Sequence, residues 1–164
     1  MQINKIDQAV ELINENEYCE VVNVSSIYET SPYGEIEQEE FFNCVIKIAT
    51  FLEPGELFHF LKSVEEKVGR KVRTKWGPRE IDLDILFYNE IMYSDDEITI
   101  PHKDLLNRDF VLVPLNEIAP DLIHPKLGKK ISEIIIFQSE PGNPSAENDR
   151  IHIIRKIPHK VLLS

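Results

Sequence analysis

The chain has 164 residues, of which 42% are hydrophobic, and a formal net charge of -11. This length suits one compact domain with its own core, and a second full domain is not expected. General nucleic-acid binding relies on an excess of Lys and Arg, so the acidic balance argues against that class of function.

Cysteine usage and hydropathy bear on the compartment. Cys19 and Cys44 are the only cysteines and stand in apolar surroundings, which predicts free thiols and no disulfide framework or zinc site. No segment approaches the roughly 18 apolar residues of a membrane helix, and the start lacks a signal-peptide pattern. We therefore expect a cytoplasmic protein that binds no membrane.

The first half of the chain predicts two helices and two strands. Apolar residues recur at helical spacing from Lys5 to Asn16 and predict an amphipathic helix. Strands are predicted over 20–28 and 42–50, separated by a long loop of a length that is often functional. Pro54 suits the first turn of a second helix, which ends at Gly69 as its expected C-terminal cap.

The second half reads as shorter elements. A strand is predicted over 80–87, a turn over 88–90, one or two brief helices over 105–118 interrupted by Pro114, and another helix over 131–137. We expect the domain to cover 1–138, with a linker and C-terminal extension over 139–164. The apolar run in that extension could add an edge strand, mediate association or be disordered.

The most informative segment is residues 75–86, KWGPREIDLDIL, in which a basic and aromatic loop precedes a strand. Because side chains alternate along a strand, Asp82 and Asp84 are expected on one face about 7 Å apart. Paired carboxylates suit hard cations such as Mg2+, which also bind phosphate oxygens. Six cations gather in and before this segment and predict phosphate binding rather than a solvated charged loop: Lys67, Arg70, Lys71, Arg73, Lys75 and Arg79.

This segment, with several others, closely resembles the 6-hydroxymethyl-7,8-dihydropterin pyrophosphokinase family of folate biosynthesis. The resemblance covers about 22–125 and includes SSIYETSPYG at 25–34, FFN at 41–43, PH at 101–102 and NRDF at 107–110. It implies an α+β fold of the ferredoxin-like kind, an antiparallel sheet with helices packed on it. The predicted order of elements gives the same βαββαβ unit once one strand is restored in front.

That first strand is where the sequence departs from the family. Family members open with a short hydrophobic strand and a Gly-Ser-Asn turn, whereas this sequence begins inside the helix that follows. We expect the strand to be missing, through an internal start or a truncated form. The alternative to an active enzyme is then an inactive ligand-binding or interaction module of the same family, associating through an exposed sheet edge.

The resemblance also implies roles for individual residues. Asp82 and Asp84 hold two magnesium ions, and Arg70 and Arg79 balance charge on the diphosphate; these four are the catalytic candidates. The implied pterin contacts are Thr30, Tyr33, Phe41, Asn43, Trp76 and Phe110. The implied ATP contacts are Glu65, Arg70, Arg73, Lys75, Arg79, Ile85, His102 and Arg108. Without the resemblance, Phe41, Trp76 and Phe110 would be assigned to the core and His102 to the start of a short helix.

The expected reaction is attack of the pterin hydroxymethyl oxygen on the β-phosphorus of ATP, with AMP as leaving group and no covalent enzyme intermediate. No general base is identified. A nucleotidyl- or glycosyltransferase could also use paired aspartates, but it would not account for the PH and NR motifs. We expect ATP and the pterin as the partners of a monomeric protein.

Overall fold

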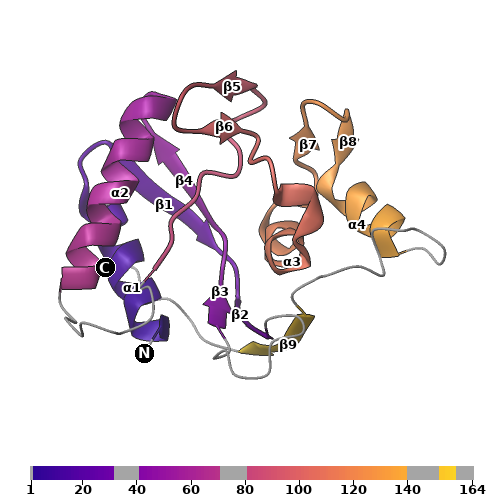
Figure 1. The fold of residues 1–164 in the computed structure, drawn as a ribbon, viewed down its shortest axis with the longest axis horizontal. Coiled ribbons are helices and arrows are strands. Elements are labelled where there is room, and N and C mark those ends of the chain that lie inside the picture. The colour runs from indigo at the N-terminus through magenta and orange to yellow at the C-terminus, as the bar shows by residue number, and fades with distance from the viewer. Residues whose placement is uncertain (1, 32–40, 71–80, 140–151, 158–164) are drawn as a thin grey trace.

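The computed structural model describes residues 2–31, 41–70, 81–139 and 152–157 (Figure 1). Its elements, in chain order, are α1 (Gln2–Glu15), β1 (Cys19–Val24), β2 (Ile27–Ser31), β3 (Phe41–Asn43), β4 (Ile46–Thr50), α2 (Pro54–Arg70), β5 (Tyr93–Ser94), β6 (Thr99–Ile100), η1 (Leu105–Asn107), α3 (Asp109–Ile118), β7 (Ile123–His124), β8 (Lys129–Lys130), α4 (Ile131–Ser139) and β9 (His152–Ile157). Helices combined with small antiparallel sheets confirm the predicted α+β class.

The two predicted amphipathic helices are confirmed as α1 and α2. Pro54 is the first residue of α2, and the Glu53 N–H donates to the Glu56 carboxylate at 2.9 Å, which satisfies a backbone donor at the helix start. The predicted cap at Gly69 is wrong, because α2 continues to residue 70. Val68 is fully buried, and its packing in the core stabilises this last turn, so the helix does not end at the glycine.

The predicted strands over 20–28 and 42–50 are each divided in two. β1 pairs antiparallel with β4, and β2 pairs antiparallel with β3. Ser25 stands at the break: its N–H donates to the Val45 carbonyl and its hydroxyl accepts the Val45 N–H, both at 2.9 Å. The hydroxyl also donates to the Ser26 carbonyl at 2.8 Å, so a side chain replaces part of the regular ladder.

The C-terminal apolar run forms β9, which pairs antiparallel with the free edge of β2. The added edge strand, one of the three alternatives for this run, is therefore confirmed. The helix predicted over 131–137 is confirmed as α4, which extends to Ser139, the first residue of the expected linker.

The strand predicted over 80–87 is wrong in one respect, because its described part, 81–87, belongs to no strand ladder. The expected alternation is present: Ile81 and Leu83 pack against the core, Ile85 is buried, and Asp82 and Asp84 are exposed. The alternation follows from the apolar and polar order, whereas a ladder also needs a neighbouring strand. The turn predicted over 88–90 is confirmed, with Asn89 in the left-handed region at φ 53°.

Two short helices occupy 105–118, as predicted, but Pro114 lies inside α3 instead of interrupting it. The Pro114 side chain is fully buried, and its neighbours Leu112 and Leu115 belong to the core. Proline has no N–H, so the helix loses one hydrogen bond to the carbonyl four residues earlier. In α3 the packing of the apolar helix outweighs the loss of that hydrogen bond.

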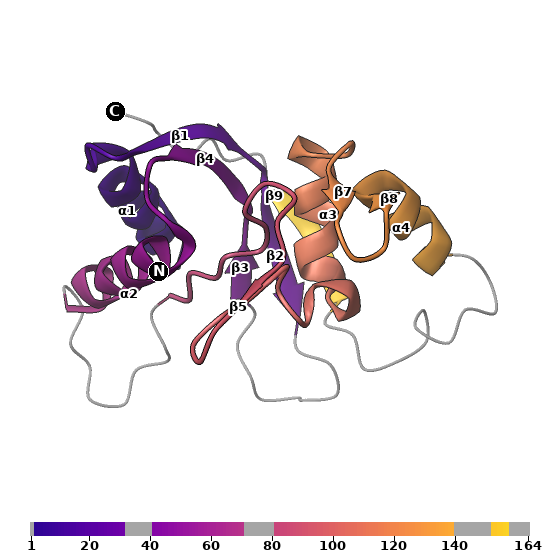
Figure 2. The same cartoon turned by 90° about the horizontal axis from the view of Figure 1, so that it is seen from above.

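The core consists of two clusters. One joins α1 and α2 to β1 and to 81–85, and the other joins α3 and α4 to Val45. Figure 2 shows the two helix pairs at opposite ends, with the strands between them. Among the described residues, no helix has the length and apolar character needed to cross a membrane.

Candidate functional site

A cleft of about 1000 Å³ lies between strands β3 and β4 and residues 81–87, the aspartate-bearing segment. Its walls come from β3 and β4, from residues 81–87 and from α3, and α1 and α2 contribute apolar side chains. Six of the predicted site residues line it: Asn43, Asp82, Asp84, Ile85, Arg108 and Phe110. A second depression, of about 600 Å³, lies along α2 beside Ile81 and includes only Glu65 of the predicted set.

Asp82 and Asp84 project from the exposed face of the segment, as the alternation predicts. The Asp84 carboxylate lies 3.9 Å from His102 Nε2. His102 Nδ1 accepts the Asp104 N–H at 3.1 Å, so the neutral imidazole carries its proton on Nε2, facing Asp84. Without the family resemblance, His102 would be assigned to the start of a short helix. The structure confirms that position, because the His102 carbonyl accepts the Leu105 N–H at 3.2 Å, and it also brings His102 to an aspartate of the cleft.

Two further contacts hold the aspartate-bearing segment in place. The His102 N–H donates to the Leu86 carbonyl at 3.0 Å. On the other side, the Leu83 N–H donates to the Glu65 carboxylate at 2.5 Å, and Lys62 Nζ lies 3.1 Å from the same oxygen. Glu65 is 18% exposed, so this charge-assisted bond fixes the segment to α2 from a largely buried position.

An aromatic and cationic pair stands at the start of α3. The Arg108 guanidinium lies over the Phe110 ring at 5.6 Å and 3.4 Å from the Asp104 carboxylate. Asn43 ends β3, opposite Tyr28 in the ladder. The cleft therefore combines a flat ring, a side-chain amide, a planar cation and two carboxylates, groups suited to a flat polar ring together with phosphate.

The donors fit magnesium. Among the described residues no group of three or more His, Cys, Asp or Glu side chains has the arrangement of a protein-only metal cage. Mg2+ is usually held by one or two carboxylates together with water and substrate phosphates, so two aspartates at an open cleft are a sufficient protein contribution.

For some of the other predicted site residues the structure gives only the element to which they belong. The structure gives Thr30 in β2, Phe41 in β3 and Arg70 at the end of α2. The Ile85 side chain is buried in the core, so a nucleotide would meet its main chain. Five predicted positions lie outside the described residues: Tyr33, Arg73, Lys75, Trp76 and Arg79.

Sequence reasoning missed Glu117. Its carboxylate accepts the Ser26 N–H at 3.0 Å, the Ser26 hydroxyl at 2.9 Å and the Tyr28 hydroxyl at 2.7 Å, and so ties α3 to β2. Burial, followed by the hydrogen bond and the charge of Glu117, raises the pKa of Tyr28 to about 12. No local pattern points to this role, because the partners are 89 and 91 residues apart.

Comparison with known proteins gives consistent matches. The family model described as 7,8-dihydro-6-hydroxymethylpterin-pyrophosphokinase matches residues 1–120. A 2-amino-4-hydroxy-6-hydroxymethyldihydropteridine pyrophosphokinase of Aquifex aeolicus is 42% identical over 132 residues, 80% of this chain and 81% of the relative. The Haemophilus influenzae protein of the same name is 38% identical over 133 residues, 81% of this chain and 82% of the relative.

A longer relative also matches. The folic acid synthesis protein FOL1 of Dictyostelium discoideum is 38% identical over 146 residues. The match covers 85% of this chain but only 22% of that protein, so the chain spans about a fifth of FOL1.

Proposed function

The chain belongs to the 7,8-dihydro-6-hydroxymethylpterin-pyrophosphokinase family, and from that membership we propose that it is an ATP-dependent diphosphokinase of folate biosynthesis. Its substrates are ATP and 6-hydroxymethyl-7,8-dihydropterin, and its products are AMP and the pterin diphosphate. Two relatives that carry this enzyme's name match over four fifths of their length, which supports the proposal.

One observation about the site supports this function most strongly. Asp82 and Asp84 line the same cleft as Asn43, Arg108 and Phe110, although these residues come from three separate parts of the chain. The carboxylates suit a phosphate-bound cation, and the amide and ring suit a flat heterocycle. A cleft that takes both groups can align an alcohol with a phosphorus atom.

The reaction forms one bond and breaks one. The hydroxymethyl oxygen of the pterin attacks the β-phosphorus, and the bond between that phosphorus and the oxygen bridging to the α-phosphate breaks. AMP leaves with the bridging oxygen, and the hydroxyl proton passes to solvent or to a base that we do not assign. Alignment and charge neutralisation supply most of the catalysis in such transfers.

Asp82 and Asp84 are proposed to bind magnesium, with two ions as the expected number. When bound, the metal supplies positive charge that neutralises phosphate oxygens as the leaving group departs. His102 Nε2 lies 3.9 Å from the Asp84 carboxylate, so His102 is the nearest proposed neighbour of this metal ligand from another part of the chain. Arg70 and Arg79 are proposed to balance the remaining charge on the diphosphate.

The substrate contacts are proposed as two sets. On the pterin side, Asn43 pairs with the polar edge of the ring and Phe110 stacks on its face, together with Thr30, Tyr33, Phe41 and Trp76. On the ATP side the proposed contacts are Glu65, Arg73, Lys75, His102, Arg108 and the main chain at Ile85. The Arg108 guanidinium lies over the Phe110 ring, so a proposed ATP contact and a proposed pterin contact are adjacent.

AMP release from MgATP by the full chain, with and without 6-hydroxymethyl-7,8-dihydropterin, tests the proposal. We expect AMP only when the pterin is present. Binding of both ligands without AMP would overturn the catalytic proposal and favour the ligand-binding module, and failure to bind the pterin would favour another nucleotide-dependent transferase. We retain a monomeric state and a cytoplasmic location as part of the proposal.

A further inference from the structure

Glu117 joins two elements that carry proposed pterin contacts. It lies near the end of α3, and Phe110 lies two turns earlier on the same face, because residues seven apart on a helix share a face. Figure 2 shows α3 beside β2, against which it packs. Glu117 is not among the residues that line the cleft, so its carboxylate acts on a ligand there only through other groups.

Both oxygens of the Glu117 carboxylate accept hydrogen bonds from the start of β2. One oxygen accepts the Ser26 N–H at 3.0 Å and the Ser26 hydroxyl at 2.9 Å, and the other accepts the Tyr28 hydroxyl at 2.7 Å. Tyr28 is 6% exposed, and because its pKa is raised to about 12, the phenol stays protonated and donates at neutral pH. These three charge-assisted hydrogen bonds, the α3–β2 link, fix how α3 lies against β2.

Tyr28 connects the α3–β2 link to Asn43. In the antiparallel ladder of β2 and β3, Tyr28 is directly opposite Asn43, and side chains at opposed positions project from the same face of the sheet. The Tyr28 side chain meets Glu117 of α3, so that face is the one against which α3 packs. Asn43 and Phe110 therefore lie on the facing surfaces of the two elements, and both line the cleft.

We infer that Glu117 is a positioning residue for the pterin, which sets the separation of the Asn43 amide and the Phe110 ring through the α3–β2 link. The inference rests on the proposed function, in which Asn43 pairs with the edge of the pterin and Phe110 stacks on its face. Stacking and hydrogen bonding each tolerate a narrow range of distances, so the two contacts must be held at one spacing. Loosening the link lowers the fraction of molecules with that spacing, and the apparent dissociation constant of the pterin rises in proportion.

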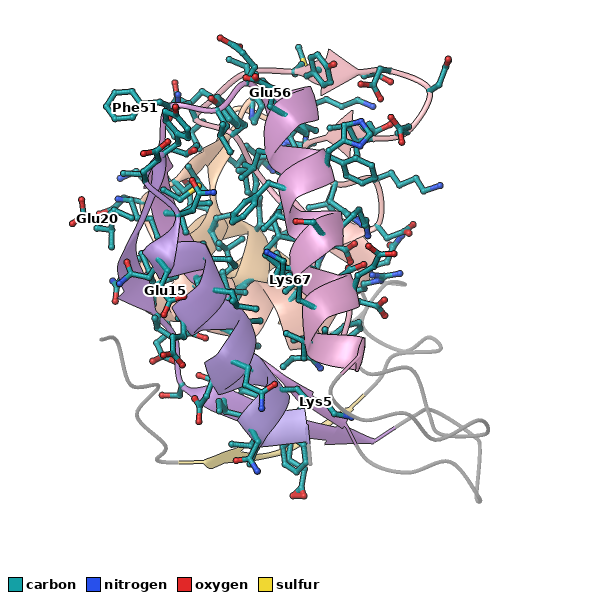
Figure 3. All side chains as sticks on the ribbon, turned by 90° about the vertical axis from the view of Figure 1, so that its left-hand side faces the viewer. Lys5, Glu15, Glu20, Phe51, Glu56 and Lys67 are labelled. Carbon is teal, nitrogen blue, oxygen red and sulfur yellow. The ribbon has the colours of Figure 1, made fainter. Side chains whose placement is uncertain are left out.

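Tyr28→Phe and Glu117→Ala remove the link in part and in full, and Tyr93→Phe is the matched control. The Tyr93 hydroxyl donates to the Asp95 carboxylate at 2.7 Å, the same distance and the same pair of groups as between Tyr28 and Glu117. Tyr93 lies in the hairpin of β5 and β6, at the end of the molecule where α2 begins, marked by Glu56 in Figure 3. It is not among the residues that line the cleft, so the control removes an equivalent bond and leaves the link intact.

Amide hydrogen exchange without any ligand measures the link itself, so its result does not depend on the proposed function. We expect exchange over 41–43 and 111–113 to quicken by at least about fivefold in Tyr28→Phe and Glu117→Ala and to stay unchanged in Tyr93→Phe. Equal exchange in the wild type and both link variants would overturn the inference, as would equal quickening in the control.

Pterin binding measures the consequence for the site. Mg2+ and an ATP analogue in which a methylene group replaces the oxygen between the α- and β-phosphorus atoms are bound first, so that no transfer occurs. We expect the pterin dissociation constant to rise by about tenfold in each link variant, while that of the nucleotide changes by less than about threefold. The double variant should bind the pterin no more weakly than Glu117→Ala, because both substitutions act on the same link.

The outcomes separate the inference from the proposed function. Equal weakening of nucleotide and pterin binding, or additive losses in the double variant, would overturn the positioning role of Glu117. A wild-type chain that binds no pterin would overturn the proposed function and the pterin role of Glu117 with it, whereas the exchange result decides the link by itself.

Discussion

Removing the carboxylate of Glu65 should loosen the aspartate-bearing segment measurably. In Glu65→Ala the Leu83 N–H loses its charged acceptor, which costs about 1.5 to 3 kcal/mol for a hydrogen bond to a charged group. The ion pair with Lys62, whose side chain is 39% exposed, adds only about 0.2 to 0.5 kcal/mol. The free energy of unfolding should therefore fall by about 2 to 3.5 kcal/mol.

Urea unfolding followed by circular dichroism measures this change. With a slope of roughly 2 kcal/mol/M, the midpoint of Glu65→Ala should fall by roughly 1 to 2 M. Lys62→Ala is the matched control, because it removes the ion pair and the contact with the Phe58 ring but leaves the Leu83 bond. We expect it to cost about 1 kcal/mol or less. Equal losses in the two variants would refute the assignment of Glu65 to the segment.

Three further outcomes follow from individual environments. The pKa of Tyr28 is raised to about 12, so the phenol ionises at a lower pH in the unfolded chain than in the folded one, and the free energy of unfolding should fall by at most about 2.7 kcal/mol as the pH rises from about 10 to 12. Tyr28→Phe should lack this loss when unfolding is measured at alkaline pH. An equal loss in Tyr28→Phe would refute the assignment of the loss to Tyr28. Burial, followed by the charges of Asp7 and Glu117, raises the pKa of Cys44 to about 12. Alkylation of Cys44 near pH 8, measured by mass spectrometry, should therefore be about a thousandfold slower in the folded chain than in the urea-unfolded chain. Rates within tenfold of each other would contradict this expectation. Phe51 is 87% exposed, so Phe51→Ser should change unfolding free energy by less than about 0.5 kcal/mol, and a loss above about 1 kcal/mol would reveal a contact that the exposure excludes.

Structural features that depend on residues close together in the sequence could be predicted. The helical periodicity that gave α1 and α2, and the alternation from Ile81 to Ile85, are set by neighbours within a few residues. The grouping of Asn43, Arg108 and Phe110 with the aspartates was reached through resemblance, because nothing in the local pattern of each residue places it in a common cleft.

Features that depend on distant partners were not predictable in this way. The Leu83 N–H meets Glu65 across 18 residues, and the role of Ser25 at the strand break depends on Val45. Pro114 stays within α3 because the packing of that helix in the core outweighs one lost hydrogen bond. Alternation at 81–87 predicted the side-chain faces but could not supply the neighbouring strand that a ladder requires.

The most direct measurement is Mg2+-dependent and pterin-dependent AMP formation by the full chain and by Asp82→Asn and Asp84→Asn, with Asp96→Asn as the control. Asp96 is exposed and is not among the residues that line the cleft. We predict that each cleft variant loses about a hundredfold or more of the activity, whereas the control keeps it. Unchanged activity in either cleft variant would contradict the assignment of the two aspartates to the metal that serves diphosphate transfer.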